Sequence, residues 1–259
     1  MYKTISDLQE FYSTTRGKVV ARAIRKKISK VWKPAKGDRV VGFGYPLPYV
    51  GKKSYINKDA DIAISLFSEE SLVNNSVNNI VKSNENIAIC SNKKWPIESN
   101  SINRVVVVHS AYSEKSLFDI LSEAWRVLVA EGRILIVVPN RSGIWARIDN
   151  NPFGVGSPYS MPQIRDILKK HKFNPEREER ALFFPPTDKS RFILGTYMIW
   201  ENIGSGMCNA LGGVNIIEAN KRIYAGDKFF NKIKQVNQSG VLLPTGSIRT
   251  SSTHKGMLD

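Results

Sequence analysis

The segment from Arg104 to Pro139 constrains the fold more than any other part of this sequence. It contains two continuous apolar runs, RVVVVH and RILIVVP, on either side of a stretch whose apolar residues recur every three or four positions. Strands that are apolar on both faces are typical of the middle of a parallel sheet, because helices cover both sides of such a sheet. We therefore predict a strand, a crossover helix over Ser113–Ala130 and a second, parallel strand.

The same alternation extends toward both ends of the chain. Further strands are expected over Arg39–Phe43, Asp61–Phe67, Asn86–Cys90, Ala181–Phe184 and Gly213–Tyr224, and further helices over Ser6–Ser13, Thr15–Trp32, Ser160–Lys170 and Thr187–Glu201. The stretch 140–159 is rich in Gly, Pro and Asn and is predicted to be a long loop. Repeated strand–helix units predict an α/β fold, whose ligands bind beyond the carboxyl ends of the strands.

Several classes of protein are excluded by what the sequence lacks. The two cysteines, Cys90 and Cys208, and the three histidines are scattered, which argues against a metal site or a disulfide framework. The longest apolar runs are far shorter than the ~20 residues that span a bilayer, so no transmembrane segment is expected. The first residues do not have the order of a signal peptide, and we expect a cytoplasmic protein.

The charge is strongly positive and concentrated at the start of the chain. The net charge is +15, and residues 1–40 hold eleven Lys or Arg against three Asp or Glu. A basic helix at this place can attract nucleic acid or an anionic lipid surface by its field. It can equally be the solvated face of an ordinary amphipathic helix, and the sequence leaves both interpretations open.

The stretch WPIESNSINRVVVVHSAYSEKSLFDILSEAWRVLVAEGRILIVVPN, from Trp95 to Asn140, resembles the class I S-adenosylmethionine-dependent methyltransferases of the type 11 group. The likeness lies in the Trp-Pro-Ile turn, the strand ending at His109, the Glu-x-x-Arg-Val-Leu helix and the Glu-Gly-Arg turn before the next strand. EFY…GKVVARAIRKKI, PFGVGSPYS and GGVNIIEANKRIY also resemble an alphaproteobacterial subset of these proteins. The resemblance implies a Rossmann-like, doubly wound, mostly parallel seven-stranded sheet with an N-terminal helical extension.

The resemblance also implies a cofactor, S-adenosyl-L-methionine, and a place for it. The residues implied to bind it are Gly42, Phe43, Gly44, Tyr45, Ser91, Asn92 and His109. The pattern departs from the family where Gly42 replaces a usual acid and where Pro46 and Pro48 replace small residues, since proline offers no N–H donor. After the second strand, Glu69 or Glu70 is expected to bind the ribose.

Two functions follow from this pattern. The first is methyl transfer to an unidentified acceptor, and the second is a catalytically silent relative that binds RNA or a protein through its basic N-terminal helix. His109 is a candidate general base, or a structural residue at the end of its strand. Arg141, Trp145, Arg147 and Tyr159, in the long loop, are candidates for contact with the acceptor.

The sequence suggests three parts. Residues 1–36 are expected to form the basic helical extension and residues 37–225 the Rossmann-like domain. Residues 226–259 are polar and rich in Gly, Ser and Thr, and are expected to form a loose tail.

Overall fold

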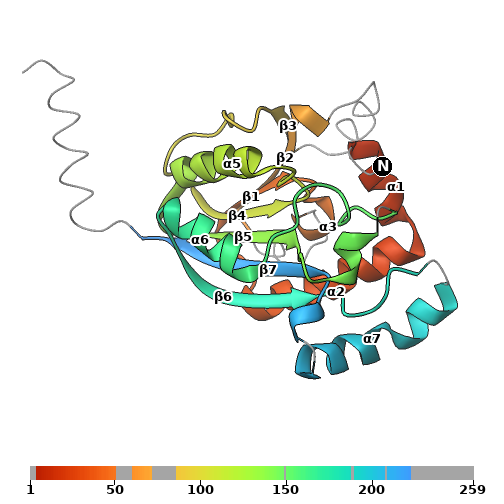
Figure 1. The fold of residues 1–259 in the computed structure, drawn as a ribbon. Helices are drawn as coiled ribbons and strands as arrows, with labels where there is room; N and C mark the ends of the chain where they lie inside the picture. Colours follow the sequence, from red (N-terminus) through yellow and green to blue (C-terminus); the bar gives the residue numbers. More distant parts are fainter. Residues whose placement is uncertain are drawn as a thin grey trace, which may run out of the picture. The chain divides into compact units, whose positions relative to one another are not determined.

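A computed structural model of the chain describes residues 4–50, 60–71, 86–148, 150–187, 190–207 and 209–222. Its centre is one seven-stranded sheet of order β3-β2-β1-β4-β5-β7-β6 (Figure 1). The strands are β1 (Arg39–Gly44), β2 (Ile62–Ser68), β3 (Ile87–Cys90), β4 (Ile102–Val108), β5 (Leu128–Pro139), β6 (Phe173–Ala181) and β7 (Val214–Lys221). The Rossmann-like seven-stranded sheet that the sequence predicts is thereby confirmed.

The sheet is mixed. The pairings from β3 through β5 are all parallel, whereas β7 runs antiparallel to both β5 and β6. The predicted crossover from β4 to β5 is present, with Val105 to Val108 buried in the middle of the sheet. The connection between the parallel neighbours β4 and β5 is a helix, as is usual for a parallel crossover.

Helices lie on both faces of the sheet. They are α1 (Ile5–Ser13), α2 (Thr15–Val31), α3 (Leu47–Val50), α5 (Glu114–Val127), α6 (Met161–Lys170) and α7 (Ser190–Met207), with short 3-10 turns η1 (Glu69–Ser71), η2 (Ile144–Arg147) and η3 (Asn209–Leu211). The apolar faces of α5 and α6 enter one core, and that of α2 enters the core on the other face.

The N-terminal helices share this core instead of standing apart from it. Val20, Ile24, Ile28 and Val31 form a stripe at helical spacing along α2, and all four are buried against the sheet. Thr4 begins α1 with a capping box, and the Thr14 side chain caps α2 by accepting from the Gly17 N–H. The boundary at residue 36 stays a prediction.

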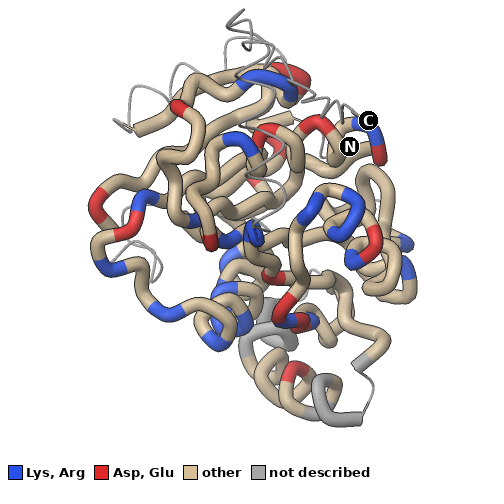
Figure 2. Tube along the Cα trace, turned by 90° about the vertical axis from the view of Figure 1, so that its left-hand side faces the viewer, with Lys and Arg blue, Asp and Glu red and all other residues tan. Residues whose placement is uncertain are grey.

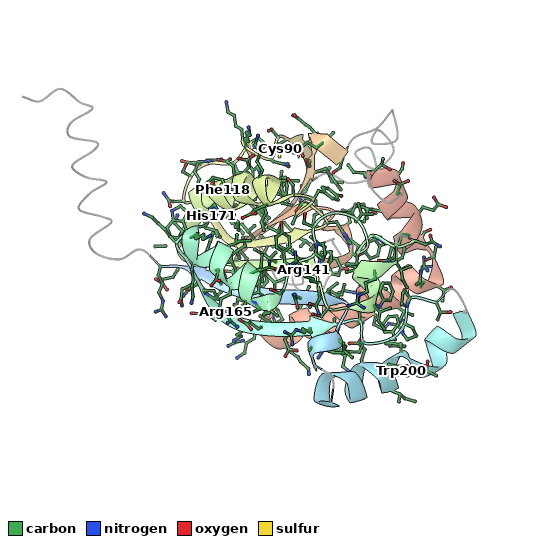
Figure 3. The ribbon with its side chains drawn as sticks, viewed as in Figure 1. Cys90, Phe118, Arg141, Arg165, His171 and Trp200 are labelled. Atoms are coloured by element: carbon green, nitrogen blue, oxygen red, sulfur yellow. The ribbon has the colours of Figure 1, made fainter. Side chains whose placement is uncertain are left out.

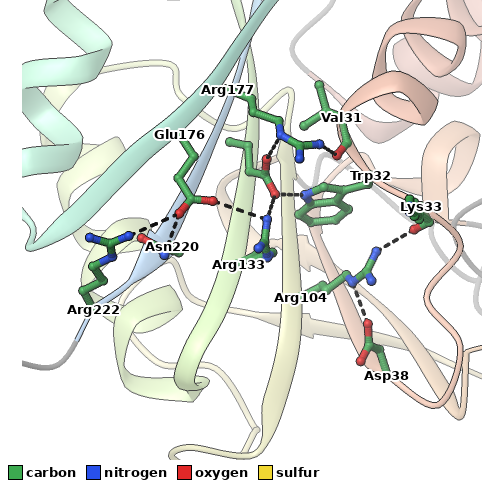
Figure 4. Close-up of polar contacts among 11 residues, drawn as sticks. Val31, Trp32, Lys33, Asp38, Arg104, Arg133, Glu176, Arg177, Asn220 and Arg222 are labelled. Atoms are coloured by element: carbon green, nitrogen blue, oxygen red, sulfur yellow. Dashed lines mark hydrogen bonds and ion pairs between the residues drawn. The ribbon is translucent and has the colours of Figure 1, made fainter.

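A polar network fastens the end of α2 to the sheet (Figure 4). Glu218 on β7 is fully buried, and its Oε1 accepts from Trp32 Nε1 at 2.8 Å and from Arg133 Nη1 at 2.6 Å. Arg177 on edge strand β6 donates to the Val31 carbonyl at 2.7 Å. The charged side chains thus join α2, β5, β6 and β7 at one point.

Two predicted elements are wrong in their position. The strand expected at Ala181–Phe184 is instead β6, Phe173–Ala181, with the sequence FNPEREERA. Charged side chains and a proline hid it, and both are typical of an edge strand, where they discourage pairing with other chains. The helix expected to reach Ala130 ends at Val127, because Leu128 already pairs with β4.

The remaining predicted elements agree with the structure to within about three residues, except that β5 begins at Leu128 and not at Arg133, and α7 runs past the predicted end at Glu201. Helix α7 begins at Ser190, after the predicted start at Thr187, and it continues to Met207. Strand β7 ends at Lys221, before the predicted end at Tyr224, and residues 223–224 and the predicted tail over 226–259 lie outside the described residues. Within the described part of the chain, no helix has the length and apolar character that crossing a membrane requires.

Candidate functional site

The switch point of the sheet lies between β1 and β4. These strands are neighbours, with Gly44 opposite Val108, while the chain leaves β1 toward β2 and leaves β4 toward β5. The two connections therefore diverge, and the residues after Gly44 and Val108 border the place where such sheets bind ligands. Four of the predicted site residues, Gly42 to Tyr45, lie here.

The turn after β1 requires glycine at Gly44. Its φ is 96°, and a Cβ at this position would lie 2.1 Å from the Val108 carbonyl oxygen. The following N–H, of Tyr45, donates to the same carbonyl at 2.9 Å. A Cβ on Gly42 would lie 2.3 Å from Pro46 Cβ, so the proline ring occupies the side on which an acidic side chain would stand.

Aromatic side chains from four segments meet above this turn. Tyr12 of α1 stacks on Tyr45 with the ring centres 5.6 Å apart, and its hydroxyl lies 2.8 Å from that of Tyr49. The same hydroxyl lies 2.7 Å from His109 Nε2, and the His109 ring lies 4.8 Å from Phe153. We call these five residues the aromatic cluster.

His109 ends β4 with an unusual backbone. Its φ of 53° lies in the left-handed region, which costs a non-glycine residue on the order of 1 kcal/mol. Burial lowers the pKa of its imidazole to about 3, so the ring is neutral at pH 7. A neutral ring with so low a pKa is a weak base near neutral pH, which favours a positioning role for His109 over proton abstraction.

One polar atom beside the aromatic cluster is left without a partner. Ser110 is 3% exposed, and its Oγ has no hydrogen bond to any described residue. Ser110 lines a small cavity of about 20 Å³ together with His109, Tyr112 and Phe153. That volume holds a water molecule and not a nucleoside. Tyr45, Tyr49 and Phe153 of the aromatic cluster are themselves buried.

Two of the residues predicted to bind the cofactor, Ser91 and Asn92, directly follow β3. Asn92 is buried; its Oδ1 accepts from Ser68 Oγ at 2.7 Å and its Nδ2 donates to Ser116 Oγ at 3.0 Å. Ser116 Oγ in turn donates to the Ser110 carbonyl at 3.2 Å, which links Asn92 to the loop after β4. Ser91 is partly exposed at the start of a tight turn.

The other side chains predicted to contact the cofactor are either buried in the core or exposed to solvent. Phe43 is buried and stacks on Trp95, with ring centres 4.8 Å apart. Glu69 and Glu70, after β2, are exposed. Both glutamates are therefore accessible to a ligand near the end of β2, whereas the Phe43 ring is not.

The long loop after β5 separates its four predicted contact residues. Arg141 (labelled in Figure 3) and Arg147 are exposed, whereas Trp145 is fully buried and donates from Nε1 to the Phe184 carbonyl at 2.7 Å. The Tyr159 ring is buried and its N–H donates to the Pro139 carbonyl at 3.0 Å. Only the two arginines can meet a ligand from solvent in this conformation.

Sequence reasoning missed Tyr12 and Asn151. Asn151 is fully buried; its side chain donates to the Trp145 carbonyl at 3.0 Å and accepts from the Phe153 N–H at 2.8 Å, which holds Phe153 against His109. A buried position in a loop leaves no periodic signal. Tyr12 had one weak signal, an aromatic pair at the end of a short helix, but nothing in the sequence places that helix at the switch point.

Solved structures resemble this fold at low sequence identity. A SAM-dependent methyltransferase from Thermotoga maritima superimposes with a TM-score of 0.57 and 12% identity, covering 84% of this chain and 96% of the other. One from Aquifex aeolicus gives 0.53 and 15%, covering 83% and 97%. One from Mesorhizobium loti gives 0.51 and 11%, covering 75% and 96%.

The chain has the fold of S-adenosylmethionine-dependent methyltransferases. At these identities the likeness shows the fold alone. No protein-family model and no curated protein matches the sequence. The methyltransferase fold nevertheless directs attention to the switch point, where the glycine turn, the unpaired Ser110 hydroxyl and the aromatic cluster come together.

Proposed function

We propose that this chain is an S-adenosylmethionine-dependent methyltransferase that binds its cofactor at the carboxyl ends of β1 to β4. The observation that carries the proposal is the tight turn at Gly44, which lies beside the buried Ser110 hydroxyl. That hydroxyl has no partner among the described residues, and both lie at the switch point of a methyltransferase fold. A buried hydroxyl without a partner costs about 1–3 kcal/mol, so a ligand that bonds it gains that amount. The type 11 grouping and a cytoplasmic location stay predictions from the sequence.

The residues present fit the cofactor in part. Ser110 Oγ, Ser91 and the exposed carboxylates Glu69 and Glu70 are polar groups available around the strand ends. Gly42 and Phe43 contribute to the shape of the turn, because Pro46 covers the first and Trp95 the second. Entry of a nucleoside requires the stacked pair of Tyr12 and Tyr45 to separate, since these rings occupy the space above the turn.

The chemistry asks for positioning more than for a strong base. The cofactor supplies a methyl group on a cationic sulfur, so an aligned acceptor and a dry site are the main requirements. The buried rings of the aromatic cluster leave room for little water, and aromatic rings attract cationic groups. Neutral His109 holds the Tyr12 hydroxyl, which sets where α1 stands over the turn. The exposed Arg141 and Arg147 are suited to an anionic part of the acceptor.

Calorimetric titration of the full chain with S-adenosylmethionine and with S-adenosylhomocysteine tests the proposal. Binding should be accompanied by stabilisation of about 2.7 kcal/mol when the ligand is at about 100 times its Kd. Ser110→Ala should weaken binding about fivefold to a hundredfold, because the ligand loses a hydrogen bond of about 1–3 kcal/mol. Ser122→Ala, at an exposed position on α5, is the matched control and should leave the affinity unchanged.

Absence of heat and of any thermal shift with millimolar cofactor would overturn the methyltransferase proposal. Equal weakening by Ser110→Ala and Ser122→Ala would remove Ser110 from the site. Methyl transfer itself is then assayed with labelled cofactor and extracts of small molecules, lipids and RNA as acceptors.

The packing of Tyr12 on Tyr45 beside the glycine turn favours a second candidate. This is a methyltransferase-like protein without catalytic activity that binds RNA or a protein through its basic N-terminal helix. Tyr12→Ala separates the two candidates because it removes the ring stacked on Tyr45. Cofactor affinity that rises in Tyr12→Ala supports a site that Tyr12 closes. No cofactor binding in either form, with RNA binding that falls steeply with salt, supports the silent module.

A further inference from the structure

A basic groove of about 470 Å³ lies between α2 and α7 and shares no lining residue with the aromatic cluster. Its α2 wall carries Arg22, Arg25, Lys26, Lys27 and Lys30. Glu201 is the one acidic residue among the described residues that line it. Figure 2 shows Lys and Arg positions gathered just above α7, the helix at the bottom of that view.

Most of this positive charge faces solvent. Lys27 is buried and forms an ion pair with Glu179 at 3.3 Å, whereas the other four cationic side chains of the groove are exposed. They recur on one side of α2 because positions three and four residues apart share a helix face. The groove therefore presents a dense positive field to whatever approaches it.

Helix α7, on the other side of the groove, buries a charged residue and exposes apolar ones, which is the reverse of an ordinary surface helix. Tyr197 and Glu201, one turn apart, are buried, and the Glu201 carboxylate accepts from the Phe183 N–H at 2.8 Å. Three consecutive apolar residues face outward: Met198 is 49% exposed, Ile199 56% and Trp200 44%. Figure 3 labels Trp200 on α7. A surface helix normally turns its polar residues outward, so this apolar face is expected to have a partner.

The apolar face and the basic groove are continuous. Met198 lines the groove and is also exposed, so it joins the cations of α2 to Ile199 and Trp200. We infer that this surface docks the protein on an anionic phospholipid bilayer. The cations face the lipid phosphates, and Met198, Ile199 and Trp200 enter the headgroup region.

The chemistry of α7 favours a bilayer over RNA. Single-stranded RNA gains from stacking on aromatic rings, but Met and Ile offer it little. A bilayer interface gains from all three side chains, since aliphatic groups reach the acyl boundary and Trp prefers the interface. The inference concerns docking alone and does not depend on methyltransferase activity.

Sedimentation of the full chain with vesicles tests the inference. Binding is expected to vesicles of phosphatidylcholine mixed with phosphatidylglycerol and not to phosphatidylcholine alone. Lys26→Glu/Lys30→Glu should lower the partition coefficient about tenfold or more, since each basic residue near an anionic surface contributes about fivefold. Lys169→Glu/Lys170→Glu carries the same charge change on exposed positions of α6, on the other face of the sheet, and should change it much less.

Trp200 provides a second readout. It is the most exposed tryptophan that the structure describes, so bilayer docking should shift the tryptophan emission to shorter wavelength. Trp200→Gln should abolish the shift and lower partitioning severalfold, while cofactor titrations stay as in the parent chain.

Three results would overturn the bilayer inference. The first is equal partitioning to both kinds of vesicle, or to neither. The second is an equal loss in the two lysine double variants, which would indicate net charge instead of the α2–α7 surface. The third is binding to single-stranded RNA that Lys26→Glu/Lys30→Glu removes while vesicles fail to bind, which would assign the surface to RNA.

Discussion

The N-terminal helices are fastened to the sheet at two places whose chemistry is opposite. At the switch point, Tyr12 of α1 contacts Tyr45, Tyr49 and His109 through neutral rings and hydroxyls. At the end of α2, Trp32 contacts the buried carboxylate of Glu218, to which Arg133 also donates. The contact of Tyr12 consists of uncharged groups and lies beside the unpaired Ser110 hydroxyl. The contact of Trp32 includes a buried carboxylate that accepts hydrogen bonds from more than one element of the fold.

We therefore expect the Glu218 network to stabilise the fold, and the aromatic cluster to be able to replace its own contacts with contacts to a ligand. A buried carboxylate that loses its donors leaves an uncompensated charge, so the Glu218 network resists rearrangement. The aromatic cluster loses only ring contacts and single hydrogen bonds when Tyr12 moves, and a ligand can replace these. The following variants test this contrast, from the largest expected effect to the smallest.

Gly44→Ala should lower the free energy of unfolding by about 4 kcal/mol, from backbone strain at positive φ plus overlap in a packed site. The new Cβ would lie 2.1 Å from the Val108 carbonyl oxygen. Gly37→Ala is the matched control, since Gly37 also has a positive φ but nothing lies within 4 Å of its Cβ position. Urea unfolding should show a loss of only about 1 kcal/mol there. Equal losses would mean that the approach of β1 to β4 can relax.

Arg133→Met should cost about 3 kcal/mol, because it removes a main donor to the buried Glu218 carboxylate. Arg165→Met is its control and removes an ion pair with Glu178 in which both side chains are partly exposed, so its expected cost is under about 1 kcal/mol. Chemical denaturation of both variants measures the difference. Similar small costs would show that the Glu218 network contributes no more than a surface pair.

Acidification should destabilise the protein through His109. Its folded pKa of about 3 lies below the unfolded value, so the unfolded chain binds a proton that the folded chain does not. Stability is then lost as pH falls below about 6.5, by about 2 kcal/mol at pH 5 for this group. His109→Gln should remove that part of the pH dependence, and His171→Gln should retain most of it. An imidazole of His109 that titrates near 6.5 by NMR contradicts the prediction.

Tyr12→Phe should have the smallest effect, a loss of about 1 kcal/mol. It keeps the ring stacked on Tyr45 but removes the hydroxyl that meets both Tyr49 and His109. Thermal unfolding measures the loss. A loss as large as that in Arg133→Met would mean that the aromatic cluster holds the fold as firmly as the Glu218 network does.

Local patterns were sufficient for most elements. The valines of β4, the helical spacing in α2 and the starts of α5 and α6 depend on neighbouring residues, and each agrees with the prediction to within about one or two residues. Strand β6 failed because its charges and proline suit an edge position, and only the finished sheet defines its edges.

The candidate site depends less on local patterns than the fold does. Gly44 and His109 were singled out because glycine turns and strand ends have sequence signals, and their part in binding stays a prediction. The position of Pro46 over Gly42, the burial of Trp145 and the partners of Asn92 depend on contacts between distant segments.

The sequence by itself determined an α/β chain with a buried β4–α5–β5 unit and a basic α2, because hydrophobic periodicity and charge are local properties. Only the tertiary structure decided that β7 runs antiparallel between β5 and β6, that Tyr12 lies over the glycine turn, and that α7 turns its apolar residues outward beside the basic helix. Such features depend on which faces remain uncovered once the sheet is complete, and that follows from the packing of the whole chain.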